Sequence, residues 1–351
     1  MKAIVEILPL YNDNAFHVGD GEKIKLGIDA IKEGKKVYVL DFDKFVEKVH
    51  LFKSKNVIDP QVFKQYKNSM QNGNVRNLLR NINFSTVSSR IVRTWNTISM
   101  QEVQTQIRDA KGLPYLPGSS IKGAIRTAVL AQLAIANRSQ LGTAHAELGF
   151  ERKMFQISSA NKVDDYFRFV RVSDAYFNPK DVKIVQMRGL NDPKHPIRNA
   201  LEVIAPGENS VSEFNLSVDE KKLYLVCAGN IPKRLGFLFS PRSLFTAVND
   251  YTTRQLKRDS QYMQVVAADD PDIDDYVAAI EYVLDDCNDC GPGECILRVG
   301  MGIGKEFTTG LWAKYAQGSN PATSRSYYEC DGEIRLLGFV KLRIKSVKQE
   351  G

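Results

Sequence analysis

The chain has 351 residues, of which 43% are hydrophobic and 25% charged, a balance that excludes a globally disordered protein and allows about two domains. Its formal net charge of +7 is compatible with a nucleic-acid partner but does not require one. No stretch is long and apolar enough for a membrane span. An odd number of cysteines, five, indicates a reducing cytoplasm rather than a disulfide framework.

The beginning of the chain contains both strand and helix patterns. The run "KAIVEILPL" (residues 2–10) predicts a strand, and the turn-rich "YNDNAFHVGDGEK" (residues 11–23) predicts a loop. A second strand is predicted over "KKVYVLDF" (residues 35–42). Helical patterns follow from about residue 42 to 52 and from 60 to 80. This part of the chain therefore mixes both kinds of element.

The middle of the chain contains the clearest helix. A polar strand is predicted over "STVSSRIVRTW" (residues 85–95), and a loop then passes into a helix over "GLPYLPGSSIKGAIRTAVLAQLAIANR" (residues 112–138). The run "FRFVRVSDAYF" (residues 167–177) predicts another strand. Proline and glycine concentrate between residues 192 and 207, which we interpret as a region between domains.

The last third of the chain continues the mixture. Residues 212–229 predict one or two strands, and "PDIDDYVAAIEYVLDD" (residues 271–286) predicts an amphipathic helix. A strand over residues 295–304 runs into a glycine-rich stretch, and residues 333–344 predict a closing strand. Because helices and strands do not alternate regularly, we predict the α+β class rather than a doubly wound sheet.

The glycine-rich stretch "RVGMGIGKEFTTG" is not a known phosphate loop. A P-loop is excluded because Val299 occupies the position of its first glycine and Glu306 that of its magnesium-binding hydroxyl. A dinucleotide loop is excluded because Phe307 replaces its third glycine. Backbone amides after a strand can still bind a phosphodiester, although a tight turn with a solvated lysine is the alternative. The candidate RNA-binding residues here are Gly302, Gly304 and Lys305.

The helix start "LPGSSIKGAIR" combines features of a phosphate-binding site. Ser119 or Ser120 is a suitable N-cap, and Lys122 and Arg126, four residues apart, share one face. Gly123 costs about 1 kcal/mol relative to alanine within a helix, which suggests that something packs closely there. Free amides at a helix N-terminus, hydroxyls and cations together favour an anion such as phosphate. A core helix with a solvated basic face is the alternative.

The loop "FHVGDG" is a third candidate. His17 is one of four histidines and can act as a general acid/base or stack on a base. Gly19 and Gly21 leave the backbone open to a ligand. Arg76, Arg80, Arg90 and Arg93 are candidate extensions of the basic surface that includes the helix start, with solvated helix and strand arginines as the alternative.

Two acidic or thiol clusters are weaker candidates. Cys287, Cys290 and Cys295 include one spaced pair of a zinc site but lack a second pair. The run "DDPDIDD" contains carboxylates that can hold magnesium, but a helix start favours carboxylates in any case. We therefore predict no metal and no cofactor.

The three glycine-containing pieces, in this order, resemble the RAMP superfamily of CRISPR-associated proteins. They are "HVGDG", "LPGSSIKGAIR" and "GMGIGKEFTTG", and the resemblance extends to Asp174 in "RVSDAYF" and to the spacing of Gly207 and Phe214. The matching pieces are scattered over residues 4–310. Within the superfamily, the length and the form "PGSSIKGAIR" resemble most the fifth-subunit family of type III-A (Csm) effector complexes.

The resemblance implies two ferredoxin-like (RRM-like) domains with helical insertions, and we place them at residues 1–200 and 201–351. It implies a crRNA-binding subunit that caps the 3′ end of the guide, supports crRNA maturation in antiviral defence, and contacts single-stranded RNA mainly through phosphates. Other Csm subunits, crRNA and a host nuclease are the implied partners, in the cytoplasm and without a membrane.

Two functions of different classes remain open. The first, which we favour, is a binding and assembly subunit without chemistry of its own. The second is a metal-independent endoribonuclease that processes crRNA precursor, with His17 as acid/base and Lys122 or Lys305 stabilising the transition state. The second requires further catalytic groups beside a single histidine.

Overall fold

A computed structural model gives the structure of the chain. It describes residues 2–10, 14–54, 57–136, 151–152, 154–159, 162–194, 196–207, 211–226, 235–236, 240–301 and 323–348.

A five-stranded antiparallel sheet has the N-terminal strand at its centre. The strand order is β12-β16-β1-β20-β17. β1 buries Ala3, Val5 and Ile7 at every second position, as one face of a strand requires. The bounds of the strands are β1 Lys2–Leu8, β12 Val170–Val172, β16 Ser212–Val218, β17 Glu294–Arg298 and β20 Phe339–Lys348.

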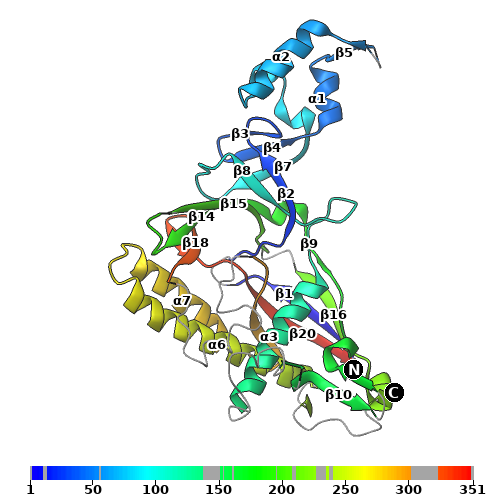
Figure 1. Cartoon of the computed structure of the whole chain (residues 1–351), viewed down its shortest axis with the longest axis vertical. Helices are drawn as coiled ribbons and strands as arrows, with labels where there is room; N and C mark the ends of the chain where they lie inside the picture. Colours follow the sequence, from blue (N-terminus) through cyan, green and yellow to red (C-terminus); the bar gives the residue numbers. More distant parts are fainter. Residues whose placement is uncertain are drawn as a thin grey trace.

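The helices that accompany this sheet give it a ferredoxin-like order. The chain passes through β1, α3 (Gly118–Ala136), β12, β16, α6 (Pro241–Val266) and β20, which is the β-α-β-β-α-β sequence, with β17 as an added edge strand. Helices α3 and α6 contact each other and the edge strands β12 and β17 (Figure 1). α7 (Ile273–Asn288) lies against α6.

A larger sheet of nine strands contains most of the intervening chain. Its order is β2-β8-β15-β14-β7-β4-β3, with β18 added to β14 and β19 to β18. The pairs β14·β7 and β15·β8 are parallel, and the other pairs are antiparallel. The strand bounds are β2 Gly19–Lys25, β3 Ala30–Glu33, β4 Lys36–Leu40, β7 Ser88–Thr94, β8 Glu102–Gln106, β14 Val182–Leu190, β15 Ile197–Ile204, β18 Arg325–Cys330 and β19 Glu333–Arg335.

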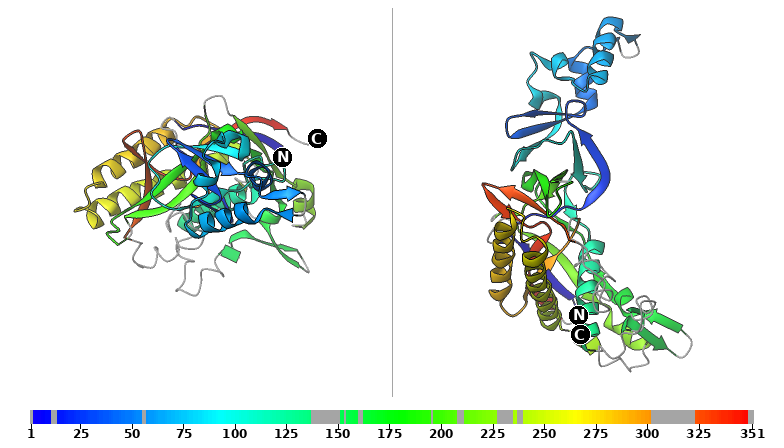
Figure 2. Two further views of the ribbon diagram at one scale, coloured as in Figure 1. Left: turned by 90° about the horizontal axis from the view of Figure 1, so that it is seen from above. Right: turned by 60° about the vertical axis from the view of Figure 1, so that its left-hand side comes forward.

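A small helical lobe stands at the far end of the larger sheet, away from α6 and α7 (Figures 1 and 2). It contains α1 (Phe42–Lys48), which is N-capped by Asp41, and α2 (Pro60–Gln71), which is capped by Asp59. The helix predicted over 60–80 stops early because Gly73 has a φ of 62°, the left-handed geometry that ends helices. The lobe also holds the hairpin of β5 (Phe52–Ser54) and β6 (Val57–Ile58). The side chains that form its core are Ile31, Phe45, Val75, Leu79 and Val87.

Two short strand pairs and one further helix lie outside the two sheets. β9 pairs with β13, and β10 pairs with β11, both antiparallel. Their bounds, with that of the remaining helix, are β9 Tyr115–Leu116, β10 Gln156–Ser159, β11 Lys162–Asp165, β13 Ala175–Tyr176 and α5 Glu220–Val226. Among the described residues there is no helix long and apolar enough to cross a membrane.

The α+β class is confirmed, but the region interpreted as a connection between domains is not a linker. Residues 197–204 form β15, whose Ala200, Leu201 and Val203 are buried in the middle of the larger sheet. A division between residues 200 and 201 would pass through this strand. It would also separate β1 from β16 and β20, which pair with it. The two-domain division stays a prediction.

Two further predictions were wrong in detail. Residues 220–226 form α5 instead of a second strand, because Asp219 ends β16 and accepts the Lys222 N–H at the helix start. Ser119 and Ser120 lie within the first turn of α3 rather than at its N-cap, since the helix already begins at Gly118. The longest helix, α6, was not predicted.

Gly118 and Gly123 provide a matched test of the α3 start. A Cβ on Gly118 would lie 2.2 Å from the carbonyl oxygen of Val172, whereas nothing lies within 4 Å of a Cβ on Gly123. The described part of the chain therefore does not pack closely against Gly123. We expect Gly118→Ala to lower the free energy of unfolding by about 2–3 kcal/mol, and Gly123→Ala to raise it by about 0.5–1 kcal/mol. Chemical denaturation measures both, and equal effects would contradict the close approach at Gly118.

Candidate nucleic-acid interface

His17 is held inside the protein, where β15 meets the loop that follows β1. Its side chain is 0% exposed, and Nδ1 lies 2.6 Å from the carbonyl oxygen of Glu202. Because a carbonyl only accepts, Nδ1 carries the proton and Nε2 is left as an acceptor. Nε2 has no hydrogen-bond partner among the described residues. Burial lowers the pKa of His17 below its ordinary value, against the opposing effect of Glu202, so the ring is neutral.

Glycines of two different motifs meet at this histidine. Gly300 has a φ of 81°, and a Cβ there would lie 2.2 Å from the carbonyl oxygen of His17. The next amide, of Met301, donates to that same oxygen at 2.8 Å. A Cβ on Gly19 would lie 3.0 Å from His17 Nε2. The "FHVGDG" loop and the beginning of the glycine-rich stretch are therefore in contact. Gly302, Gly304 and Lys305 lie outside the described residues.

The carboxylate of Glu202 accepts hydrogen bonds from several residues of the site. Its role was not predicted from the sequence. Glu202 is 0% exposed. Its Oε1 accepts Nε and Nη2 of Arg90, both at 3.1 Å, and its Oε2 accepts the backbone N–H of Gln106 at 3.1 Å and Nη2 of Arg108 at 3.3 Å. Burial lowers the pKa of Arg108, and the adjacent Glu202 opposes that shift. Two guanidinium groups on one carboxylate leave the cluster with a net charge of +1.

Gln106 connects this cluster to the third motif. Its side-chain Oε1 accepts the N–H of Val18 at 3.0 Å, and its Nε2 donates to the carbonyl oxygen of Tyr115 at 3.2 Å. Tyr115 begins β9, which leads directly into the α3 start at Gly118. One amide side chain thus joins the loop after β1 to the segment before α3.

One of the backbone amides at the α3 start, which the sequence predicted to be free, already donates a hydrogen bond within the protein. The N–H of Gly118 donates to the carboxylate of Asp174 at 2.8 Å, so an anion of the protein itself already takes this amide. Ser119 is exposed and Ser120 is half-buried. Lys122 has no ion pair among the described residues, and burial lowers the pKa of its ammonium. Lys122 is therefore the available cation of this helix start.

Arg126 is engaged inside the protein. Its guanidinium forms two hydrogen bonds with Asp165, at 2.9 and 2.7 Å, and one with Glu151 at 2.9 Å. It also lies over the rings of Phe155 and Phe167, at 4.3 and 5.2 Å from their centroids. With both carboxylates and both rings as partners, Arg126 supports the packing around α3, and its predicted RNA contact would have to compete with them.

The two remaining predicted arginines differ in environment. Arg90 is half-buried and bound to Glu202, whereas Arg93 is exposed. No ion pair of Arg93 is found in the described part of the chain. Gly21, the last glycine of the first motif, has a φ of 88° and open space around its Cα. Gly21 therefore permits a turn that other residues would strain.

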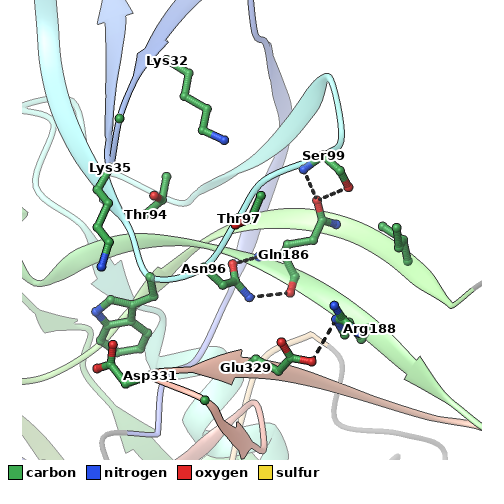
Figure 3. Close-up of a pocket in the computed structure, with 14 residues that line it drawn as sticks. Lys32, Lys35, Thr94, Asn96, Thr97, Ser99, Gln186, Arg188, Glu329 and Asp331 are labelled. Carbon is green, nitrogen blue, oxygen red and sulfur yellow. Dashed lines mark hydrogen bonds and ion pairs between the residues drawn. The ribbon is translucent and has the colours of Figure 1, made fainter.

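A cavity of about 510 Å³ lies apart from these residues (Figure 3). Its polar walls are already bonded to each other: Asn96 exchanges hydrogen bonds with the backbone of Gln186 at 2.7 and 3.0 Å, the Gln186 side chain accepts from Ser99, and Arg188 pairs with Glu329 at 3.1 Å. None of the predicted RNA-binding residues lines it. The cavity is therefore not the predicted interface.

The cysteine and aspartate clusters have structural roles. Cys287 and Cys295 are buried, and burial raises the pKa of Cys287 to about 12, so its thiol stays protonated. Asp270 accepts the amides of Asn191 and Asp272 at 2.6 and 3.0 Å. Within the described ranges no three metal-binding side chains come together.

Comparisons with known proteins agree with the arrangement of the motifs. The family model of the RAMP superfamily matches residues 14–306. The CRISPR system protein Csm5 of Streptococcus thermophilus is 27% identical over 241 residues, which are 63% of this chain and 64% of that protein. The chain thus spans less than two thirds of the curated relative it matches.

Two solved structures share the fold. A chain in the cryo-EM structure of a Csm–crRNA–target RNA ternary complex of a type III-A CRISPR-Cas system has a TM-score of 0.66 at 20% identity, covering 98% of this chain and 100% of that one. The crystal structure of T. onnurineus Csm5 has a TM-score of 0.68 at 17% identity, covering 96% and 99%.

The Glu202 cluster predicts a large effect of a small substitution. Glu202→Gln leaves Arg108, whose side chain is 13% exposed, without its buried counter-charge. We expect the free energy of unfolding to fall by about 3–5 kcal/mol. Glu102→Gln is the control, because Glu102 pairs with Lys23 at 2.9 Å on the exposed surface, where loss of an ion pair should lower the stability far less. Equal losses in chemical denaturation would refute the role of Glu202.

The buried histidine predicts a pH dependence of stability. The unfolded chain takes up a proton on His17 as the pH falls through about 6.5, whereas the folded chain resists because the pKa of the buried ring is lowered. Stability should therefore decrease as the pH falls below about 6.5, by at most about 1.4 kcal/mol per pH unit. His17→Asn removes the titration, so its free energy of unfolding should fall less between about pH 7 and pH 5. A variant with the same pH slope as the wild type would contradict this.

Proposed function

Because the chain belongs to the RAMP superfamily, we propose that it is a crRNA-binding subunit of a type III-A (Csm) CRISPR effector complex that caps the 3′ end of the guide. The observation that carries the proposal is the connection of all three glycine-containing motifs to the Glu202 cluster, through His17, Met301 and Gln106. Fixed guanidinium groups suit phosphate groups of single-stranded RNA.

The similar proteins support the assignment of partners. One similar chain belongs to a Csm–crRNA–target RNA complex, and two similar proteins are called Csm5. We therefore propose crRNA and other Csm subunits as partners, support of crRNA maturation through a recruited host nuclease, and a location in the cytoplasm. Cys287, Cys290 and Cys295 are free thiols, which agrees with a reducing compartment.

Nuclease chemistry through His17 is not favoured. A general acid/base must reach the proton that it transfers. The ring of His17 is 0% exposed, and its Nδ1 is already committed to the backbone of Glu202. A binding role does not require His17 to reach a proton of the RNA, because the buried ring can fix the position of its loop through the hydrogen bond to Glu202.

RNA binding measured as a function of salt tests the proposal. For single strands the slope of log affinity against log salt is about −0.7 per phosphate contact. We expect wild-type protein to bind a single-stranded crRNA with a negative slope, and Lys122→Ala to flatten it by about 0.7. Lys222→Ala is the control, because Lys222 is exposed on another helix and pairs with Asp219 at 3.8 Å.

A second experiment separates binding from cleavage. Labelled crRNA precursor that is incubated with the protein in EDTA should stay intact. Specific cuts that disappear in His17→Ala would favour the endoribonuclease instead. A wild-type protein without affinity for crRNA would refute the proposed function altogether.

A further inference from the structure

Three cationic side chains stand side by side on neighbouring strands of the larger sheet. In the strand register Lys36 of β4 lies opposite Arg93 of β7, and Arg93 lies opposite Lys183 of β14. Residues opposite each other point to the same face, so the three form one row across the strands. Neighbouring strands are about 4.8 Å apart, and the row therefore spans about 10 Å. We call it the cross-strand basic row.

The row is poorly neutralised. Lys36 and Arg93 are exposed, and neither has an ion pair within the described ranges. Glu33 lies opposite Lys36 on the other side, but it pairs with Arg76 at 3.3 Å. Lys183 donates to the carbonyl oxygen of Lys180.

The environment of Lys183 shows the repulsion within the row. Burial is the main cause that lowers the pKa of Lys183, and the neighbouring charge of Arg93 lowers it further. The charge of Asp181 acts in the opposite direction.

Such a row destabilises the free protein. Like charges directly opposite each other on paired strands are unfavourable. A polyanion lying across the row would remove this repulsion and release its own counterions. Ile91, two residues before Arg93 on the same strand face, is 46% exposed and offers an apolar surface beside the charges.

The row lies on the opposite face of β7 from the Glu202 cluster. Arg90 and Arg93 are three residues apart, and side chains of a strand alternate between its faces. Arg90 turns toward Glu202, and Arg93 turns away from it with Lys36 and Lys183. The sequence interpretation that placed Arg90 and Arg93 on a single basic surface was therefore wrong.

We infer that the cross-strand basic row is a second RNA-binding surface, which contacts phosphates of a single-stranded RNA segment on the face opposite the Glu202 cluster. The inference rests on the proposed function, since it assigns a further contact of the same ligand. The sheet then presents RNA contacts on both faces of one strand.

The test removes the row's charge without removing its side-chain volume. The variant is Lys36→Gln, Arg93→Gln and Lys183→Gln. We expect the slope of log affinity for a labelled single-stranded RNA against log salt to flatten by about 2, at about 0.7 for each lost contact. The melting temperature should stay equal to or above that of the wild type, because the cross-strand repulsion is gone.

A second triple variant controls for net charge. Lys23→Gln, Lys44→Gln and Lys222→Gln remove the same number of charges from exposed lysines that already pair with carboxylates, at 2.9, 3.0 and 3.8 Å. A flatter slope in the row variant alone supports the inference. Equal flattening in both variants, or no flattening in the row variant, overturns it while the wild type still binds RNA. If the wild type does not bind RNA, the proposed function fails and the inference fails with it.

Discussion

A single buried carboxylate organises the candidate site. Glu202 lies in the centre of the larger sheet, where removal of its charge from water would be costly without compensation. Two arginines and a backbone amide provide that compensation, and they come from β7 and from the end of β8 with the residues beyond it. The backbone of Glu202 in turn fixes the tautomer of His17. The position of each motif therefore depends on one residue that belongs to none of them.

The second constraint is the close approach of backbones. The carbonyl oxygen of His17 is contacted from one side by Gly300 and Met301, and a side chain on Gly300 would occupy the same space as that oxygen. Gly118 is similarly placed against the carbonyl oxygen of Val172. These glycines differ physically from Gly123 and Gly21, which have open space around them. The first pair joins segments of the chain, whereas at the second pair a side chain would have room.

The sequence predicted the local elements better than their partners. The α3 helix and the strand of β7 follow from periodicity, which is a local property. Glu202 could not be identified, because a carboxylate within "ALEVIAP" becomes a hub only through arginines about a hundred residues away. Arg126 was read as a free cation for the same reason, since Glu151 and Asp165 reach it only in the folded chain. Helix α6 was not predicted, because the polar Asp259 interrupts the row of hydrophobic residues on its buried face. Asp259 is buried in the folded chain, where it forms an ion pair with Arg325.

One error did not depend on long-range contacts. Residues three apart share a face on a helix but lie on opposite faces of a strand, and the run around Arg90 and Arg93 was already predicted to be a strand. Parity alone therefore separates the two arginines. Once they are separated, Arg90 has a counter-charge and Arg93 has like-charged neighbours on both sides. The strand thus uses one arginine to hold the fold together, and it presents the other on the exposed face, where it has no ion pair among the described residues.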